Sequence, residues 1–236
     1  AEHRPRCRND LDLLTGRARV PSLYFFELAR AAAGVTPDVG ALEKDARLAN
    51  EGIPCLDGRN PAKAHPLHRV CDGVINDLYS DEDALEMAKL FLEFGAGING
   101  GQVPEKRDTP LKAAASLHAE KTGIFYINEG ADILHAGTHG GTALHWAAWV
   151  GRDKLVKKLI GEGAEINKRC IDFQGTPLLW AVHGYVQGGT KNRLNQVECV
   201  RLLLAAGADK TMPNIEGVAA IGFLDDNDVE MRNVLQ

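Results

Sequence analysis

The sequence has neither an excess of basic residues nor a long apolar run. Its 236 residues include 27 Lys and Arg against 32 Asp and Glu, which gives a net charge of −5. Because a negative chain lacks the cationic surface that attracts a phosphate backbone, we expect no nucleic-acid partner. No stretch approaches the roughly 18–20 apolar residues that cross a bilayer, so we expect no membrane contact. With 44% hydrophobic and 25% charged residues, the composition is that of a folded protein.

Closely paired cysteines are also lacking. None of the five cysteines forms a Cys-x-x-Cys pair, so neither a zinc ribbon nor a thioredoxin-like redox pair is indicated. We expect reduced, partly buried thiols, although pairing among them stays open. The sequence begins at Ala1 without an initiator Met, which fits either a trimmed start or the removal of a leader. The compartment is therefore open between cytoplasmic and periplasmic or secreted.

The common motifs of catalysis and cofactor binding are missing. The sequence has no Gly-x-Ser-x-Gly elbow, no phosphate-binding Gly-x-x-x-x-Gly-Lys-Ser/Thr loop and no Gly-x-Gly-x-x-Gly turn. His135 and His139 have the spacing of two metal ligands on one helix face, but Gly137 and Gly140 disfavour a helix there. We expect no enzymatic activity, no cofactor and no metal site.

An internal repeat runs through most of the chain. The stretch 141–148 reads GTALHWAA, and 175–182 reads GTPLLWAV, 34 residues later. The stretch 108–114, DTPLKAA, fits the same template 33 residues earlier, and 65–70 is a weaker copy. Each copy leads to a Gly-Ala pair after an apolar stretch, at positions 95, 130, 163 and 207. Two shared elements in the same order in four units indicate a repeat architecture.

Each unit predicts two short helices. Thr142 and Thr176 suit the N-cap of a first helix, and Pro177 suits the first helical position. Leu144 and the alanines after it place apolar and small groups on one helix face. Gly163 supplies the left-handed residue that ends a second helix. Because such a unit cannot bury both faces alone, stacking of units must complete the core.

This pattern resembles the ankyrin-repeat family, whose unit of about 33 residues carries a Thr-Pro-Leu-His-x-Ala signature. The resemblance implies an all-α solenoid of stacked helix-turn-helix units joined by short hairpin turns. We expect an N-terminal arm or partial cap at 1–21 and a repeat domain at 22–236. Its six units are expected at 22–60 (a degenerate cap), 61–104, 105–137, 138–171, 172–213 and 214–236 (a C-terminal cap). We expect a monomer.

Two departures from the family pattern stand out. The first and fourth clear units are nine or ten residues longer than the others, with the extra residues in 74–82 and 186–196. The second segment is polar and contains glycine, which predicts a surface loop. It is either a partner-contacting finger or a neutral insertion. The resemblance also implies that His145 makes a hydrogen bond between units, and we expect Lys112 and Leu179 to lose it.

The resemblance further implies that a partner docks on the concave side, formed by hairpin tips and the exposed positions of the first helices. Aromatic residues are only 6% of the chain, yet several fall on this predicted face in the third and fourth clear units, at 138–171 and 172–213. Accessible aromatic residues are frequent in binding hot spots. Alternatively, they pack under the long loop as a satellite core. The candidate partner-binding residues are Trp149, Phe173, His183, Tyr185, His139, Ser116, Leu117 and Asp108.

The sequence therefore predicts a non-enzymatic protein–protein interaction module that binds another protein on its concave face and inter-helix loops. Two alternatives stay open. One is a bacterial toxin-neutralising (immunity) or secreted effector-type ankyrin protein that blocks a specific enzyme. The other is an enzyme with an unrecognised pocket that uses His183 or His139.

Overall fold

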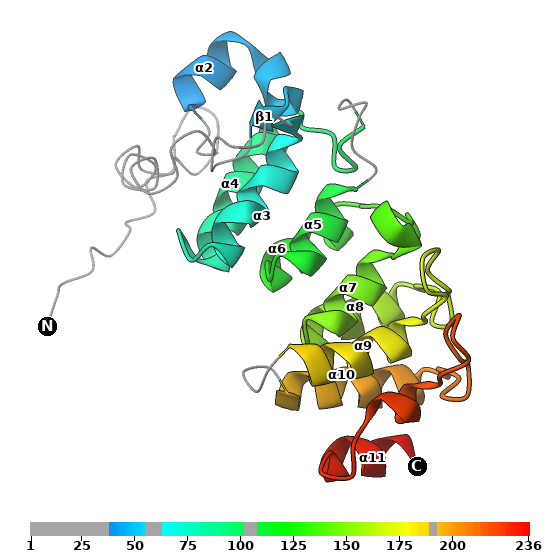
Figure 1. Cartoon of the computed structure of the whole chain (residues 1–236). Coiled ribbons are helices and arrows are strands. Elements are labelled where there is room, and N and C mark those ends of the chain that lie inside the picture. Colours follow the sequence, from blue (N-terminus) through cyan, green and yellow to red (C-terminus); the bar gives the residue numbers. More distant parts are fainter. Residues whose placement is uncertain (1–37, 55–62, 102–107, 189–192) are drawn as a thin grey trace, which may run out of the picture.

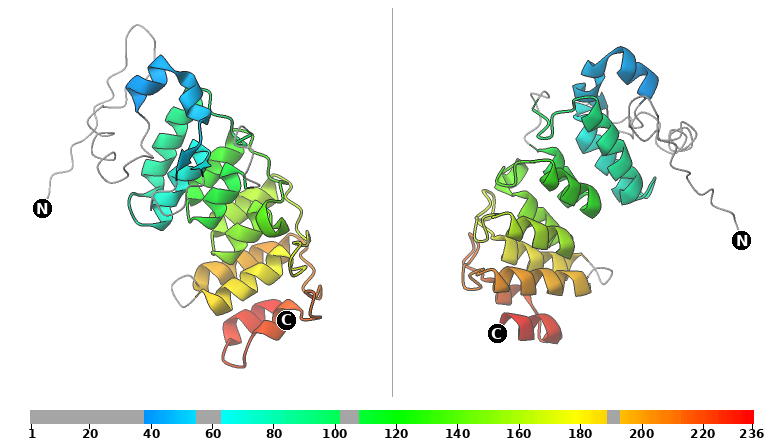
Figure 2. Two further views of the ribbon diagram at one scale, coloured as in Figure 1. Left: turned by 45° about the horizontal axis from the view of Figure 1, so that its top comes forward. Right: turned by 180° about the vertical axis from the view of Figure 1, so that it is seen from behind.

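The computed structural model describes residues 38–54, 63–101, 108–188 and 193–236. Its helices come in pairs that follow one another along an elongated array (Figure 1). First helices pack beside first helices, and second helices beside second helices (Figure 2). The four central pairs are α3 (Pro66–Ile75) with α4 (Asp81–Glu93), α5 (Pro110–Ser116) with α6 (Glu120–Asn128), α7 (Ala143–Trp149) with α8 (Asp153–Gly161), and α9 (Pro177–Gln187) with α10 (Arg193–Ala205). The predicted all-α stack is confirmed.

Shorter elements lie at the two ends of the array. The N-terminal end has α2 (Val39–Lys44), a 3-10 helix η1 (Ala46–Asn50) and two short antiparallel strands, β1 (Ile53–Pro54) and β2 (Lys63–Ala64). The C-terminal end has a 3-10 helix η4 (Ala220–Phe223) and α11 (Val229–Leu235). Another 3-10 turn, η2 (Thr138–Gly140), lies before α7. The expected arm at 1–21 and much of the expected first cap lie outside the described residues.

The core lies between the two rows of helices. The leucine of the repeated motif is buried in all four central units, at positions 67, 111, 144 and 178. Small residues beside it allow close approach between units. Gly184 of α9 is the clearest case, because a Cβ there would lie 2.1 Å from the carbonyl oxygen of Trp149 at the end of α7. Any larger residue at 184 would therefore force the two first helices apart.

The extra residues of the two longer units extend the helices. α3 and α9 have 10 and 11 residues where α5 and α7 have 7 each, and α4 and α10 have 13 where α6 and α8 have 9. The prediction of a surface loop over 186–196 is therefore wrong for most of that segment, because α9 continues to Gln187 and α10 starts at Arg193. The reason is burial: Val186 packs on the core, and the buried Gln196 donates from Nε2 to the Trp149 carbonyl (2.8 Å).

Second helix α6 has no capping side chain of its own, since its N-cap residue Ala119 makes no such hydrogen bond. The carboxylate of Asp81, the first residue of α4, supplies the cap from the preceding unit. It accepts hydrogen bonds from the backbone N–H groups of Lys121 (2.6 Å) and Thr122 (3.1 Å). These are the second and third residues of α6, the positions that a local N-cap side chain normally serves.

The same arrangement recurs one unit later. Arg152, the N-cap residue of α8, makes no capping side-chain hydrogen bond. Oε1 of Glu120, the first residue of α6, accepts from the backbone N–H groups of Lys154 (3.1 Å) and Leu155 (3.4 Å). An acidic first residue in one second helix thus caps the next second helix along the array.

Asparagine side chains tie the turns after the second helices together. Asn50 donates to the carbonyl of Gly95 (2.9 Å) and accepts from the N–H of Gly97 (2.7 Å). Asn167, in the turn after α8, makes the same two bonds to the turn after α10. It donates to the carbonyl of Gly207 (3.1 Å) and accepts from the N–H of Asp209 (2.9 Å). Polar groups on both edges of the stack are therefore satisfied across unit boundaries.

Asp81→Ala should lower the free energy of unfolding by about 1 kcal/mol, because two N–H groups of α6 lose their acceptor. Urea unfolding followed by circular dichroism measures the loss. Glu82→Ala is the matched control, since Glu82 lies in the same turn but only pairs with Lys121 on the exposed surface. It should cost much less, and equal losses from the two variants would contradict capping by Asp81.

Candidate partner-binding face

His145 links the start of its helix to the hairpin that leads to the next unit, from a buried position. Its Nδ1 accepts a hydrogen bond from the backbone N–H of Thr142 (3.1 Å), and the Thr142 hydroxyl lies 2.9 Å from the same nitrogen. Its Nε2 lies 3.1 Å from the carbonyl oxygen of Lys168, in the hairpin that leads to the next unit, so Nε2 carries the proton. Burial lowers the pKa of His145 to about 4, which keeps the ring neutral at pH 7.

Lys112 replaces this histidine in the preceding unit and still makes the bond between units. Its Nζ donates to the carbonyl of Thr138 (3.1 Å) in the next hairpin and pairs with Asp108 (2.5 Å). The expectation that Lys112 loses the contact is therefore wrong, because the longer side chain reaches a different carbonyl. Leu179 is buried and carries no group that can make the bond.

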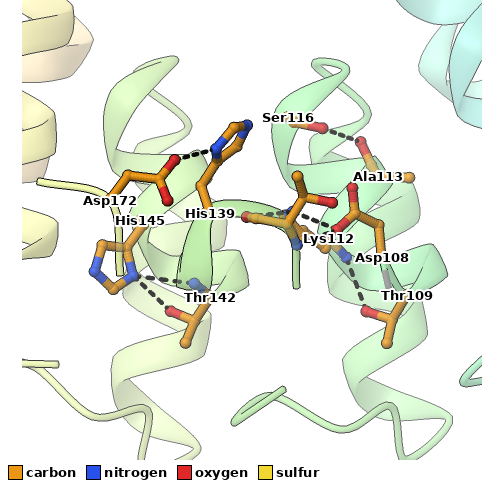
Figure 3. A network of polar contacts seen from close by, with 10 residues as sticks. Asp108, Thr109, Lys112, Ala113, Ser116, His139, Thr142, His145 and Asp172 are labelled. Carbon is orange, nitrogen blue, oxygen red and sulfur yellow. Dashed lines mark hydrogen bonds and ion pairs between the residues drawn. The ribbon is translucent and has the colours of Figure 1, made fainter. Parts of the chain in front are cut away.

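Asp108 makes a second hydrogen bond between these two units. Its Oδ1 also accepts from the backbone N–H of Thr138 (2.7 Å). Although burial raises the pKa of Asp108, the bonds from Lys112 and Thr138 hold it below its usual range. Burial lowers the pKa of Lys112 even though Asp108 opposes the shift. Figure 3 shows this cluster beside the His145 cluster on the neighbouring first helix.

His139 lies at the tip of the hairpin between these clusters. It has a positive φ of 67° and is exposed, and its Nδ1 contacts the Asp172 carboxylate of the next hairpin (Figure 3). The hairpin packs closely against the preceding unit at Gly137, where a Cβ would collide with Asp108 and Lys112. The backbone therefore presents His139 and Asp172 side by side at the surface.

A continuous aromatic row runs from the unit of α7 through the unit of α9 to η4. We define the aromatic row as Phe173, Trp180, Trp146, Trp149, His183 and Phe223. Trp180 is its centre, with ring centroids 5.4 Å from Phe173, 5.0 Å from Trp146 and 5.8 Å from Trp149. His183 lies 4.8 Å from Trp149 and 5.4 Å from Phe223. Such aromatic contacts each contribute about 0.5–1.5 kcal/mol beyond burial.

The row is packed yet remains partly accessible. Trp180 is only 3% exposed, whereas Trp146, Trp149, Phe173, His183 and Phe223 keep intermediate exposure. The Nζ of Lys112 lies 5.4 Å from the centre of the Trp146 ring, which extends the row toward the second unit. Trp149 and His183 occupy the same position in α7 and α9, seven residues after the capping threonine, as does Ser116 in α5.

Not every predicted residue joins this face. Tyr185 is 5% exposed and packs under Arg193, whose guanidinium carbon lies 4.6 Å from its ring centre. Placing Tyr185 on the binding face was therefore wrong. Leu117 directly follows α5 and packs against the core at intermediate exposure. Ser116 is also half-buried, and its hydroxyl donates to the carbonyl of Ala113 (3.2 Å).

The sequence reasoning missed three residues at this edge of the molecule. Phe223 from the terminal 3-10 helix extends the aromatic row through His183. Ile171 and Ile215, at the tips of two successive hairpins, are among the most exposed large apolar residues in the described ranges. An available signal was the repeated apolar–acidic pair, Ile171-Asp172 and Ile215-Glu216, just before two repeat motifs.

The part of the chain that the structure describes shows no group of three or more His, Cys, Asp and Glu side chains placed to hold a metal ion. Within the same ranges, no helix has the length and apolar character needed to cross a membrane. Cys71, Cys170 and Cys199 are buried free thiols, while Cys7 and Cys55 lie outside the described residues.

Comparison with known proteins identifies the repeat independently. A model of three ankyrin repeats matches residues 78–170, and a model of the single ankyrin repeat matches residues 175–215. Together the two matches cover more than half of the chain and include α4 to α10.

Curated relatives share part of this region. Palmitoyltransferase ZDHHC13 of mouse (Mus musculus) is 34% identical over 110 residues, which are 44% of this chain and 16% of the relative. Putative palmitoyltransferase ZDHHC13 of zebrafish (Danio rerio) is 28% identical over 138 residues, 52% of this chain and 20% of the relative. Palmitoyltransferase Hip14 of Drosophila melanogaster is 30% identical over 95 residues, 40% of this chain and 13% of the relative. The chain thus matches a fifth or less of the length of these relatives.

Stability should fall as the pH drops from about 6.5 toward 5. The unfolded chain binds protons at its histidines near pH 6.5, whereas burial lowers the pKa of both His145 and His65 to about 4 in the fold. Acid therefore favours the unfolded state in this window. Urea unfolding at several pH values should give a flatter pH dependence for His145→Asn, and a flatter one still with His65→Asn added. An unchanged slope in the double variant would contradict this account.

Proposed function

Because the chain belongs to the ankyrin-repeat family, we propose that it is a non-enzymatic module that binds a partner protein on the first-helix face of its third and fourth units. Ankyrin repeats are protein–protein interaction modules, and this face is the concave side of that family's arrays. The single observation that carries the proposal is the aromatic row, which is packed into place and still partly accessible.

Packing prepares this row for binding. Trp149 is held between Trp180 and His183, so its indole has little rotamer freedom left to lose when a partner covers it. Tryptophan is also enriched among the residues that dominate binding energy. His139 and Asp172 add polar groups at the hairpin end of the same face, as a polar rim does around a hot spot.

The likeness to palmitoyltransferases supports recognition by the shared repeats. It lies within the repeat array and covers 16% of the mouse relative's length, so the activity in that protein's name is not carried over to this chain. Catalysis needs converging ionisable groups, and two of the most deeply buried ones among the described residues, His145 and Lys112, are engaged in structural hydrogen bonds to backbone carbonyls. No feature of the described residues favours the toxin-neutralising alternative.

Trp149→Ala should weaken binding of the native partner by about thirtyfold, equivalent to about 2 kcal/mol, if Trp149 is a hot spot. The partner is first isolated from the native source by affinity capture, and its affinity is then measured by calorimetry. His183→Ala tests the neighbouring first helix in the same way.

Val229→Ser is the matched control, because Val229 is an exposed apolar residue of α11. It should leave the dissociation constant unchanged, and thermal unfolding should show that each variant is folded. An unchanged dissociation constant for folded Trp149→Ala would remove the aromatic row from the binding site.

A further inference from the structure

The tips of three successive hairpins form one connected edge. We define the tip strip as residues 138–140, 171–174 and 215–217. The N–H of Ile171 donates to the carbonyl of His139 (2.9 Å), and the N–H of Ile215 donates to the carbonyl of Phe173 (2.8 Å). The second and third tips are thus each hydrogen-bonded through the backbone to the preceding tip. The strip presents its side chains from a fixed backbone, much as a sheet edge does.

Two isoleucines at equivalent positions protrude from this strip. Ile171 is 71% exposed and Ile215 is 66% exposed. The backbone of Ile171 cannot move closer to the preceding hairpin, because it already packs directly on Gly140. A Cβ on Gly140 would lie 2.7 Å from the Ile171 nitrogen. Single exposed apolar residues are common on protein surfaces, but two repeated at the same structural position form a pattern.

The tip strip carries two carboxylates. Asp172 and Glu216 directly follow the two isoleucines, and both are exposed. The strip contains no Lys or Arg, and Asp172 contacts Nδ1 of His139 within it. The cations behind it are already engaged. Lys112 is buried against Asp108, and Arg169 donates from one terminal nitrogen to the carbonyls of Gln174 (3.0 Å) and Pro213 (2.7 Å).

We propose that the tip strip recognises a segment of the partner protein in which apolar side chains alternate with Lys or Arg. The apolar side chains would cover Ile171 and Ile215, and the cations would pair with Asp172 and Glu216. Because neighbouring helices pack about 8–10 Å apart, the two apolar contacts would be about that far from one another. This inference rests on the proposed function and names the chemistry of the partner.

Two short labelled peptides of equal length test the charge preference, one alternating leucine with arginine and the other alternating leucine with glutamate. Fluorescence anisotropy with the full chain should show the arginine peptide binding roughly three- to tenfold more tightly, the size expected of two exposed ion pairs. About 0.5 M salt should remove the difference. Equal affinities at low salt, or no saturable binding of either peptide, would overturn the proposal.

Variants separate the tip strip from the general negative charge of the chain. Asp172→Asn with Glu216→Gln should abolish the preference for arginine, and Ile171→Ser with Ile215→Ser should weaken both peptides. The matched control is Glu93→Gln with Glu129→Gln, which removes the same charge from exposed positions at the ends of α4 and α6. If that control abolishes the preference equally, the tip strip is not the site.

The two proposals fail in different ways. If Trp149→Ala releases the native partner while the tip-strip variants bind it as well as the unchanged protein does, the proposed function stands and this inference falls. If neither set of variants changes partner affinity, both fall.

Discussion

Each helix pair in this protein depends on polar contacts that the neighbouring pair supplies. The first turns of α6 and α8 lack local caps, and Asp81 and Glu120 provide them from the preceding unit. Lys112 reaches forward to a backbone carbonyl of the next unit, and His145 to one in the hairpin that leads to the next unit. An isolated unit would lose these contacts together with the apolar surface that its neighbours cover. Stacking is therefore a condition of folding for each unit, as in other repeat arrays.

This dependence decides which residues remain for a partner. The buried Lys112 and His145 are taken up by bonds to backbone carbonyls, so what the first helices and hairpins still present is the aromatic row and the tip strip. Both are rigid for the same reason: ring contacts link Trp149 of one unit to Trp180 and His183 of the next, and backbone bonds link each hairpin tip to the one before it. A surface held in this way loses little conformational entropy when a partner binds, which favours affinity.

The sequence predicts the parts of this structure that depend on local rules. Helix starts are predicted by Thr142, Thr176 and Pro177, and the repeated leucine predicts the buried core. The bond made by Lys112 was missed because the identity of an acceptor in the next unit depends on side-chain reach, which the motif does not encode. Tyr185 was misplaced because α9 continues without a break. On a helix with 3.6 residues per turn, two residues beyond His183 lie on nearly the opposite side, so Tyr185 faces Arg193 of α10.

Amide hydrogen exchange tests the central claim most directly. The N–H groups at the second and third positions of a helix usually exchange quickly, because no intrahelical acceptor exists for them. Here the amides of Lys121 and Thr122 in α6 and of Lys154 and Leu155 in α8 should be protected, since carboxylates of the preceding unit hold them. Protection similar to that of the helix interiors, lost at 121–122 on Asp81→Ala, would support stabilisation across unit boundaries. Fast exchange of these four amides in the unchanged protein would contradict it.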